Sequence, residues 1–307
     1  MDITPTLKKF SEFTILHSQY QHAIDSIMTS MQTTIECGEP SCPMLMGESG
    51  LGKSSVCNRL VQLLGPPTPL VKAEGWLTTL PCLYLELPSR PTINSVAIAI
   101  LDKLNVSTGG TKRSLEQQIL ATLKSRETQL VILDEFQNFA EKGAEKTKAE
   151  TCNWIKYMLN QSQITFLLSG LPTKDVIITP LTQLSARYPY RINLFPLTYS
   201  ADPHSEFRTI LALFSAEIVK LGNLHSELFL GDEHMSAALY MASGGNMRCI
   251  RRVLHGAFKQ ALIRGDGVLN NQDFSSSIEI LELPERIDKS RNPFLISCEQ
   301  VTQAISK

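Results

Sequence analysis

An eight-residue segment, Gly47-Glu-Ser-Gly-Leu-Gly-Lys-Ser54, limits the folds open to this chain. It matches the pattern Gly-x-x-x-x-Gly-Lys-Ser/Thr at every fixed position. A short apolar run, Met44-Leu-Met, precedes it, and residues 54–64 carry apolar side chains at helical spacing. The order of strand, glycine-rich loop and helix is the context in which this pattern binds phosphates. We therefore predict an α/β fold with a phosphate loop after its first strand.

The loop offers a triphosphate several kinds of contact. Its glycines let successive backbone amides turn toward the phosphates, and the helix that follows adds its positive end. Lys53 would reach the outer phosphates of ATP, and the hydroxyl of Ser54 would hold Mg²⁺. The residues that we predict to contact the nucleotide in this segment are Gly47, Glu48, Ser49, Gly50, Leu51, Gly52, Lys53, Ser54 and Ser55.

The apolar pattern after the loop alternates between strands and helices. Such alternation predicts a parallel sheet with helices on both faces. We expect five strands, at residues 44–46, 82–87, 130–133, 164–168 and 190–194, and helices between them at residues 54–64, 93–104, 114–126 and 148–161. The fold class is α/β, with a five-stranded parallel sheet followed by a small all-helical lid domain.

The alternation ends near residue 200, and helical patterns then follow one another at residues 206–221, 232–242 and 246–263. This change predicts a domain boundary. We expect a helical N-terminal lead at 1–36, a phosphate-loop domain at 37–200 and a helical lid at 201–281. Residues 282–307 contain two prolines and weak periodicity, so we expect a partly ordered tail.

A second motif, which contains two acidic residues, lies about eighty residues beyond the loop. The segment Leu130-Val-Ile-Leu-Asp-Glu places two carboxylates where a buried strand ends, at the sheet edge where open α/β folds bind ligands. We expect Asp134 to coordinate Mg²⁺ and Glu135 to orient the water that attacks the outer phosphate. Without the phosphate loop, the same pattern would indicate only a solvated turn.

Other candidates lie farther along the chain. Ser169 ends the fourth strand, where its hydroxyl would sense the outer phosphate; a serine capping a turn is the alternative. Arg187, which we prefer to Arg191, precedes the last strand, where a neighbouring subunit's arginine would complete an ATP site. In the lid, Arg248 would contact the phosphates, although Arg251 and Arg252 share its basic helix and a solvated helix face is the alternative.

Charge and cysteine content exclude some classes of protein. The formal net charge of -1 means that any nucleic-acid surface must be a local patch. Seven cysteines form no Cys-x-x-Cys pair, so we expect buried or loop thiols, with the half-site at Cys37 and Cys42 as the alternative. The N-terminus lacks the apolar stretch of a signal peptide and no run is long enough to span a membrane, so we expect a cytoplasmic protein.

The order of these motifs resembles that of the AAA+ transposition regulators TniB and TnsC, over residues 13–265. Gln183-Leu-Ser-Ala-Arg-Tyr followed by Leu194-Phe-Pro-Leu is similar to the Gln-Leu-x-x-Arg-Phe and Leu-Pro segment of TniB proteins. Leu133-Asp-Glu-Phe-Gln-Asn resembles their Asp-Glu-x-His-Asn, and Gly244-Gly-Asn matches the turn before their final lid helix. Two departures are Gly170-Leu171, where those proteins tend to have Gly-Thr, and Arg248, where TniB often lacks an arginine.

The resemblance implies an ATP-dependent homo-oligomer, a ring or a helical filament, that winds around double-stranded DNA. Such an assembly recruits or activates a transposase, meets a target-selecting protein, and uses ATP hydrolysis to disassemble. The family's DNA-facing segment corresponds here to residues that include Lys103, Thr111, Lys112 and Arg113, which would grip phosphates without reading bases; an ordinary solvated loop is the alternative.

Two rival functions remain open at the level of sequence. One is a signalling or secretion-linked ATPase of the same architecture that acts on a protein partner without DNA. The other is an adaptor in which bound ATP is a structural switch with negligible turnover. Assembly stimulated by duplex DNA would distinguish the transposition regulator from both rivals, and ATP turnover would distinguish the adaptor from the two ATPases.

Overall fold

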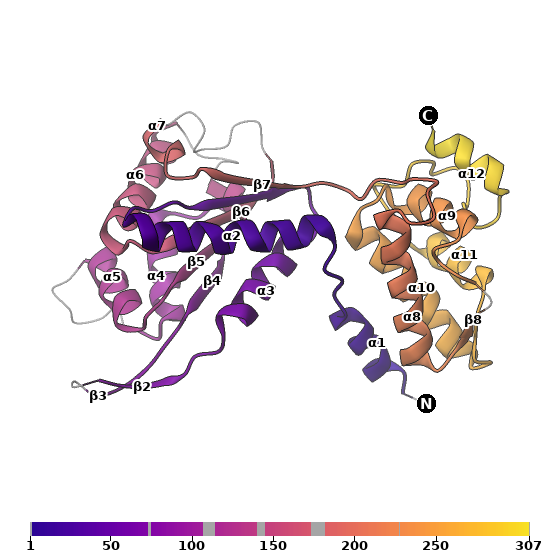
Figure 1. The fold of residues 1–307 in the computed structure, drawn as a ribbon, viewed down its shortest axis with the longest axis horizontal. Coiled ribbons are helices and arrows are strands. Elements are labelled where there is room, and N and C mark those ends of the chain that lie inside the picture. The colour runs from indigo at the N-terminus through magenta and orange to yellow at the C-terminus, as the bar shows by residue number, and fades with distance from the viewer. Residues whose placement is uncertain are drawn as a thin grey trace. The chain divides into compact units, whose positions relative to one another are not determined.

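A computed structural model describes residues 2–72, 75–106, 114–139, 145–172, 182–226 and 228–306 (Figure 1). The chain forms two compact units. The first comprises Gln19–Leu194, and the second joins Met1–Ser18 to Phe195–Lys307. Each unit is described by itself below.

The first unit is built on a five-stranded sheet in the order β4-β5-β6-β1-β7. Every neighbouring pair is parallel, as the alternating sequence pattern predicts. The expected fold class is therefore confirmed. The strands are β1 (Pro43–Gly47), β4 (Cys82–Glu86), β5 (Leu130–Asp134), β6 (Thr165–Gly170) and β7 (Tyr190–Leu194).

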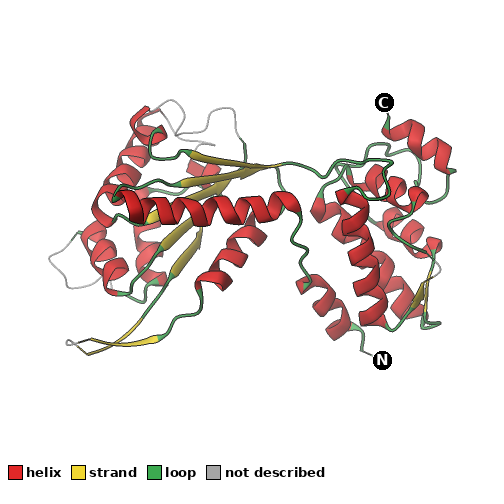
Figure 2. Cartoon of the chain, in the orientation of Figure 1, coloured by secondary structure: helices red, strands yellow, loops and turns green. Residues whose placement is uncertain are grey.

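Helices cover both faces of this sheet because the side chains of each strand alternate between two cores (Figure 2). In β5, Val131 and Leu133 belong to the core under α4, α5 and α6, whereas Leu130 and Ile132 belong to the core under α2 and α3. The helical elements of the unit are α2 (Ser18–Cys37), α3 (Lys53–Leu64), α4 (Ile93–Lys103), α5 (Leu115–Ser125), the 3₁₀ turn η1 (Phe136–Phe139), α6 (Glu145–Ser162) and α7 (Thr182–Ser185).

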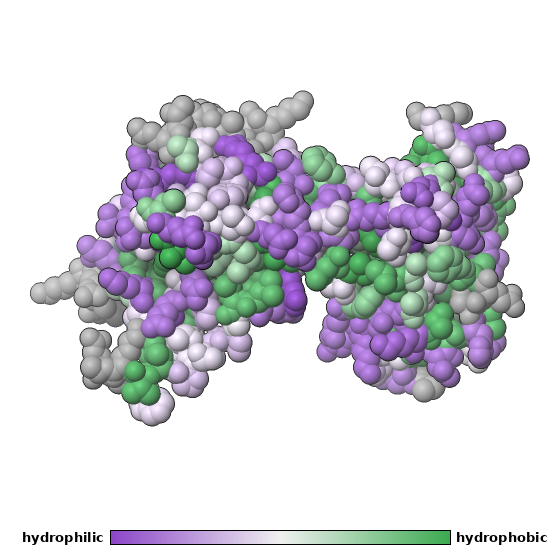
Figure 3. Space-filling model, viewed as in Figure 1, coloured by the Kyte–Doolittle hydropathy of each residue, from purple (hydrophilic) through white to green (hydrophobic). Residues whose placement is uncertain are grey.

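α2 shows how one apolar stripe attaches a helix to the sheet. Ala23, Ile24 and Ile27 are buried against the sheet, while the pair Gln21 and Asp25 lies exposed and hydrogen-bonded one turn apart. Figure 3 shows hydrophilic residues along the outer side of this helix. An antiparallel hairpin of β2 (Pro69–Lys72) and β3 (Gly75–Thr78), which the sequence pattern does not predict, lies between α3 and β4.

The second unit is largely helical. Its elements are α1 (Thr4–Glu12), α8 (Glu206–Gly222), β8 (His225–Ser226), α9 (Glu233–Ser243), α10 (Met247–Arg264), β9 (Val268–Leu269), α11 (Asn271–Ile280) and α12 (Cys298–Ile305). The three expected lid helices correspond to α8, α9 and α10. The described residues add a parallel pair of two-residue strands where the sequence suggests no strand: β8 lies between α8 and α9, and β9 lies between α10 and α11.

The N-terminal and C-terminal segments of the chain differ from the lead and the tail that the sequence predicts. Residues 1–18 belong to the helical unit because Phe10 of α1 is buried against the rings of Phe214 and Phe258. At the other end, Val301 of α12 is fully buried beside Met241 of α9. The lead therefore separates at residue 18, and the C-terminal segment carries a packed helix.

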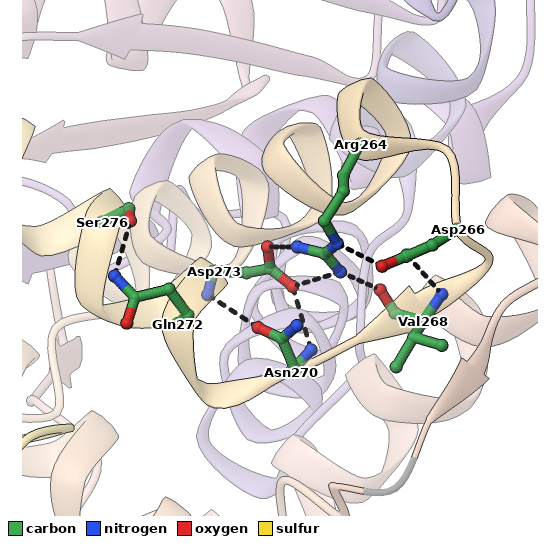
Figure 4. Close-up of polar contacts among 7 residues, drawn as sticks. All are labelled: Arg264, Asp266, Val268, Asn270, Gln272, Asp273 and Ser276. Carbon is green, nitrogen blue, oxygen red and sulfur yellow. Dashed lines mark hydrogen bonds and ion pairs between the residues drawn. The ribbon is translucent and has the colours of Figure 1, made fainter.

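An ion-paired cluster fixes the turn from α10 to α11 (Figure 4). The guanidinium of Arg264 pairs with Asp266 at 2.5 Å and also with the buried carboxylate of Asp273. Asp273 in turn accepts the backbone N–H of Asn270 at 2.9 Å, and the side chain of Asn270 caps α11. These contacts hold the end of α10, β9 and the start of α11 together, so Arg264 has a structural role.

Candidate functional site

The phosphate loop joins β1 to α3 at the carboxyl edge of the sheet. Gly52, the residue before α3, has a φ of 101°, a left-handed conformation that L side chains rarely adopt. Gly47, at the end of β1, approaches the neighbouring edge strand so closely that a Cβ atom there would lie 3.0 Å from the carbonyl oxygen of Leu194. The left-handed φ favours glycine at position 52, and the close approach of the edge strand favours it at position 47.

Lys53 lies inside this loop with 7% of its surface exposed. Its ammonium donates hydrogen bonds to the carbonyl oxygens of Gly47 at 2.7 Å and Glu48 at 3.1 Å. The side chains of Glu48, Ser49, Ser54 and Ser55 are exposed at or beside the loop. A buried cation among backbone groups at a helix N-terminus is an arrangement suited to a phosphate.

Asp134 is the centre of the site. Only 1% of its surface is exposed, and its carboxylate accepts four hydrogen bonds. Oδ1 accepts from the hydroxyl of Ser169 at 2.7 Å and from the backbone N–H of Glu135 at 3.0 Å. Oδ2 accepts from the hydroxyls of Tyr84 at 2.8 Å and Ser54 at 3.0 Å. Three residues singled out in the sequence, Ser54, Asp134 and Ser169, therefore meet at one carboxylate.

Sheet order explains this convergence. β6 lies between β5 and β1, so Ser169, the last residue but one of β6, lies between the acidic strand and the strand that leads into the phosphate loop. The carboxyl ends of parallel strands meet at one sheet edge. The expected place of the fourth strand beside the acidic strand is what the structure has.

Tyr84 is a member of the site that the sequence does not reveal. It lies within the apolar run of β4 and pairs with Ile132, two residues before Asp134, so its long side chain reaches forward to the carboxylate. Burial raises the pKa of Tyr84, and the hydrogen bond to Asp134 raises it further. The phenol therefore remains a donor at neutral pH. A tyrosine in the strand beside an acidic strand end is the signal that would have indicated it.

These oxygen ligands fit Mg²⁺. The hydroxyl of Ser54 and the carboxylate of Asp134 are hard ligands that already lie 3.0 Å apart, and Mg²⁺ is usually held by one or two such groups together with water and substrate phosphates. Among the described residues, His, Cys, Asp and Glu side chains form no group of three that would hold a metal ion by themselves.

Cys37 and Cys42 do not resemble a metal half-site. Cys37 is exposed, whereas Cys42 is buried and its sulfur accepts the backbone N–H of Phe166 at 3.4 Å. Burial raises the pKa of Cys42 to about 12, so its thiol is protonated at neutral pH and is no ready metal ligand.

The candidate trans-acting arginines lie at the opposite side of the sheet from the acidic strand. Arg187 precedes β7, which among the described strands pairs with β1 alone, and the Arg187 carbonyl accepts the N–H of Cys42 at 2.8 Å. Arg191 is on β7 and donates to the hydroxyl of Ser185 at 2.7 Å. Both arginines are therefore at the edge of the sheet.

The lid arginines differ in what they contact. Arg251 donates to the carbonyl oxygens of Phe13 at 2.5 Å and Ser11 at 2.7 Å, which anchors the end of α1. Arg248 and Arg252 are exposed on the same helix. Since Arg251 serves the packing of α1, Arg248 and Arg252 remain the candidates for a phosphate contact.

The candidate DNA segment is only partly described. Lys103 is exposed at the end of α4, whereas Thr111, Lys112 and Arg113 lie outside the described residues. Within the described ranges, the structure contains no helix whose length and apolar character would let it cross a membrane.

Comparisons with known proteins give a family and a fold. The model of the bacterial TniB protein family matches residues 9–195, more than half of the chain. No curated protein sequence matches the chain.

Solved structures with a similar fold share little sequence. Cdc6p from Pyrobaculum aerophilum aligns with a TM-score of 0.56 and 15% identity, covering 84% of this chain and 65% of its own, so this chain spans less than two thirds of that protein. The Orc1 protein of Aeropyrum pernix, solved in complex with DNA, gives 0.54 and 17%, covering 94% and 81%. The RuvB Holliday junction branch migration motor of Thermotoga maritima gives 0.50 and 14%, covering 88% and 72%.

Proposed function

Because this chain belongs to the bacterial TniB family, we propose that it is an ATP-dependent regulator of DNA transposition that assembles on double-stranded DNA and recruits or activates a transposase. The observation that carries the proposal is the cluster at Asp134. There, hydroxyls from the phosphate loop and from the end of β6 donate to the carboxylate of the acidic strand. This cluster supports ATP hydrolysis, because P-loop NTPases hold Mg²⁺ through the Ser or Thr of the phosphate loop and the Asp of an acidic strand.

Each residue of the site has a separate task in this proposal. Lys53 binds the outer phosphates, while Ser54 and Asp134 hold Mg²⁺, which neutralises charge on the phosphate oxygens. Glu135 orients the attacking water. Ser169, through its bond to Asp134, links the end of β6 to the metal ligands. Phosphoryl transfer depends mainly on such positioning and charge, and little on covalent chemistry by the protein.

Two further arginines complete the site in the assembled state. The Arg187 side chain of a neighbouring subunit stabilises the charge that develops during hydrolysis, and Arg248 of the lid contacts the phosphates. Hydrolysis then drives disassembly. The duplex is gripped through phosphates by Lys103, Thr111, Lys112 and Arg113, so binding has little sequence preference.

The test is assembly on plain duplex DNA. Purified protein with Mg-ATP, and the Glu135→Gln variant that should bind ATP without orienting water, are examined by electron microscopy with and without duplex. We expect rings or helical filaments on DNA, more persistent with Glu135→Gln. Turnover without any duplex binding would favour the rival ATPase that acts on a protein partner, and ATP binding with negligible turnover would favour the adaptor.

The DNA-facing segment is tested in the same assay. Lys103, Lys112 and Arg113 are neutralised together, and duplex affinity is measured over a range of salt concentrations. We expect weaker binding to every sequence and a salt slope shallower by about one unit per lost contact per subunit. Unchanged affinity and slope would place the grip elsewhere on the protein.

A further inference from the structure

Gln137 connects the candidate catalytic glutamate to the end of β6. It lies in η1, immediately after the acidic strand, with 7% of its surface exposed. Its side-chain Nε2 donates to the Oε2 atom of Glu135, and its Oε1 accepts the backbone N–H of Leu171 at 3.0 Å. One amide thus bridges two segments that are 34 residues apart in sequence.

The orientation of this amide is fixed by its partners. A backbone N–H can only donate, so the oxygen of the Gln137 amide must face Leu171. The NH₂ group then faces the carboxylate of Glu135, which in its ionised form only accepts. Both ends are satisfied in this orientation, and exchanging oxygen and nitrogen would oppose donor to donor and acceptor to acceptor.

The neighbouring backbone is shaped around the bridge. A Cβ atom on Gly170 would lie 2.5 Å from Oε1 of Gln137, so a larger residue there would displace the amide. Glu135 itself has a φ of 57°, a left-handed conformation that is uncommon outside glycine and asparagine. The missing side chain at Gly170 and the left-handed backbone at Glu135 therefore allow Glu135, Gln137 and the end of β6 to lie close together.

The end of β6 and the residue that follows it are consequently linked to both acidic residues of the site, directly to Asp134 and through Gln137 to Glu135. Ser169 donates to Asp134 at 2.7 Å, and two residues later Leu171 reaches Glu135 through Gln137. Any shift of this strand end moves the partners of the metal ligand and of the water-orienting carboxylate together.

We propose that Gln137 is a positioning residue for ATP hydrolysis, which holds the Glu135 carboxylate at a fixed position relative to the end of β6. The bond engages Oε2 and thereby aims the other oxygen, Oε1, at the attacking water. Without the bridge, the glutamate side chain samples several rotamers, and fewer of them lie within hydrogen-bond reach of the water. This inference rests on the proposed ATPase function.

The first test compares Gln137→Ala with wild-type protein in Mg-ATP turnover. We expect kcat to fall at least about tenfold, which is about 1.4 kcal/mol in the barrier, while KM stays within about threefold. Asn138→Ala is the matched control, because the Asn138 side chain ties the same turn to the carbonyls of Leu87 and Pro88. The bond from Asn138 to Glu135 joins backbone N–H to backbone carbonyl at 3.0 Å, so alanine keeps it and the Glu135 carboxylate is not involved. The kcat of Asn138→Ala should stay within about threefold of wild type.

The second test uses Gln137→His as a switchable replacement. A neutral imidazole has one acceptor and one donor and can bridge Leu171 to Glu135, whereas an imidazolium only donates and opposes the Leu171 N–H. The imidazole pKa is about 6.5 in water; the Glu135 carboxylate that would face the ring favours its charged form, whereas burial at this position disfavours it. We therefore expect kcat of this variant to approach wild type near pH 8.5 and to fall several-fold more than wild type near pH 5.5.

A third readout needs no nucleotide. Hydrogen exchange at the Leu171 amide should accelerate in Gln137→Ala and stay slow in Asn138→Ala. Unchanged kcat in Gln137→Ala, an equal loss in Asn138→Ala, or a Gln137→His profile parallel to wild type would overturn the positioning role. Wild-type protein that hydrolyses no ATP would instead overturn the proposed function, and the role of Gln137 in hydrolysis with it.

Discussion

At the scale of single residues, Asp134 carries a buried charge that its neighbours must stabilise. Removing a carboxylate from water is costly unless it is hydrogen-bonded, and Asp134 accepts three hydroxyls and one backbone amide. The same donors orient its oxygens at the strand end. The stability of the fold and the geometry of the candidate metal site therefore depend on the same contacts.

Tyr84→Phe tests this dependence. Removing the phenolic hydroxyl takes one donor from a carboxylate that is 1% exposed, and hydrogen bonds to charged groups contribute about 1.5–3 kcal/mol. We expect the first unit to lose about that much stability against denaturant without nucleotide. The loss should shrink in Mg-ATP, because a bound cation replaces the missing donor. Tyr157→Phe, on an exposed position of α6, is the control.

Lys53→Ala tests the phosphate loop. The ammonium lies among the loop carbonyls and is the cation that we assign to the outer phosphates. We expect ATP affinity, measured by calorimetry, to fall more than tenfold, a change above about 1.4 kcal/mol. The exposed Lys124→Ala variant should bind as wild type does. Affinity within about threefold of wild type for Lys53→Ala would contradict the assignment.

At the scale of elements, α1 is a short helix whose place is set by distant contacts. A nine-residue helix is marginal alone, and its stability comes from packing against α8 and α10. Arg251 of α10 adds hydrogen bonds to the carbonyls that the end of α1 leaves without helical partners, 238 and 240 residues away in sequence. Arg251 of α10 thus supplies hydrogen-bond donors to the C-terminal end of α1 in the same unit.

Arg251→Ala should release α1. Because the lost guanidinium leaves carbonyls at the helix end unpaired, we expect faster hydrogen exchange over residues 4–12 and earlier proteolysis between residues 13 and 19. Arg252→Ala, an exposed neighbour on α10, should change neither. Equal protection of α1 in both variants would show that the aromatic packing of Phe10 suffices without the arginine.

At the scale of the whole molecule, the chain joins an α/β unit and a helical unit through the connections at residues 18–19 and 194–195. Its net charge of -1 provides no general attraction to DNA, so under the proposed function a local cluster would bind the duplex, and assembly would repeat that cluster over several subunits. Assembly and DNA binding are thus expected to depend on each other.

Mixing two inactive variants tests whether subunits share a site. Arg187→Ala keeps its own phosphate loop, and Lys53→Ala keeps its arginine, so neighbouring subunits of a mixed assembly can combine an intact loop with an intact Arg187. We expect DNA-stimulated hydrolysis to return on mixing, although each variant alone is inactive. If the mixture stays as inactive as its components, Arg187 does not act in trans.

Some features of this protein were readable from the sequence because their causes are local. The phosphate loop is a continuous segment whose glycines and lysine follow from backbone geometry and charge, and buried strands and amphipathic helices follow from the spacing of apolar side chains. The nearness of Asp134 and Ser169 was predictable, because each lies at or next to the end of an apolar strand and parallel strands end at one edge.

Other features were decided only by the tertiary structure, because they join segments far apart in the chain. Tyr84 meets Asp134 across 50 residues and Gln137 meets Leu171 across 34, and nothing local distinguishes these side chains from others in an apolar strand or a turn. The apolar patterns of α1 and α12 are too short to indicate which elements these helices pack against. Their partners, α10 and α9, lie more than fifty residues away in the chain. Packing of the whole chain sets such contacts, so they follow from the fold and not from any one segment.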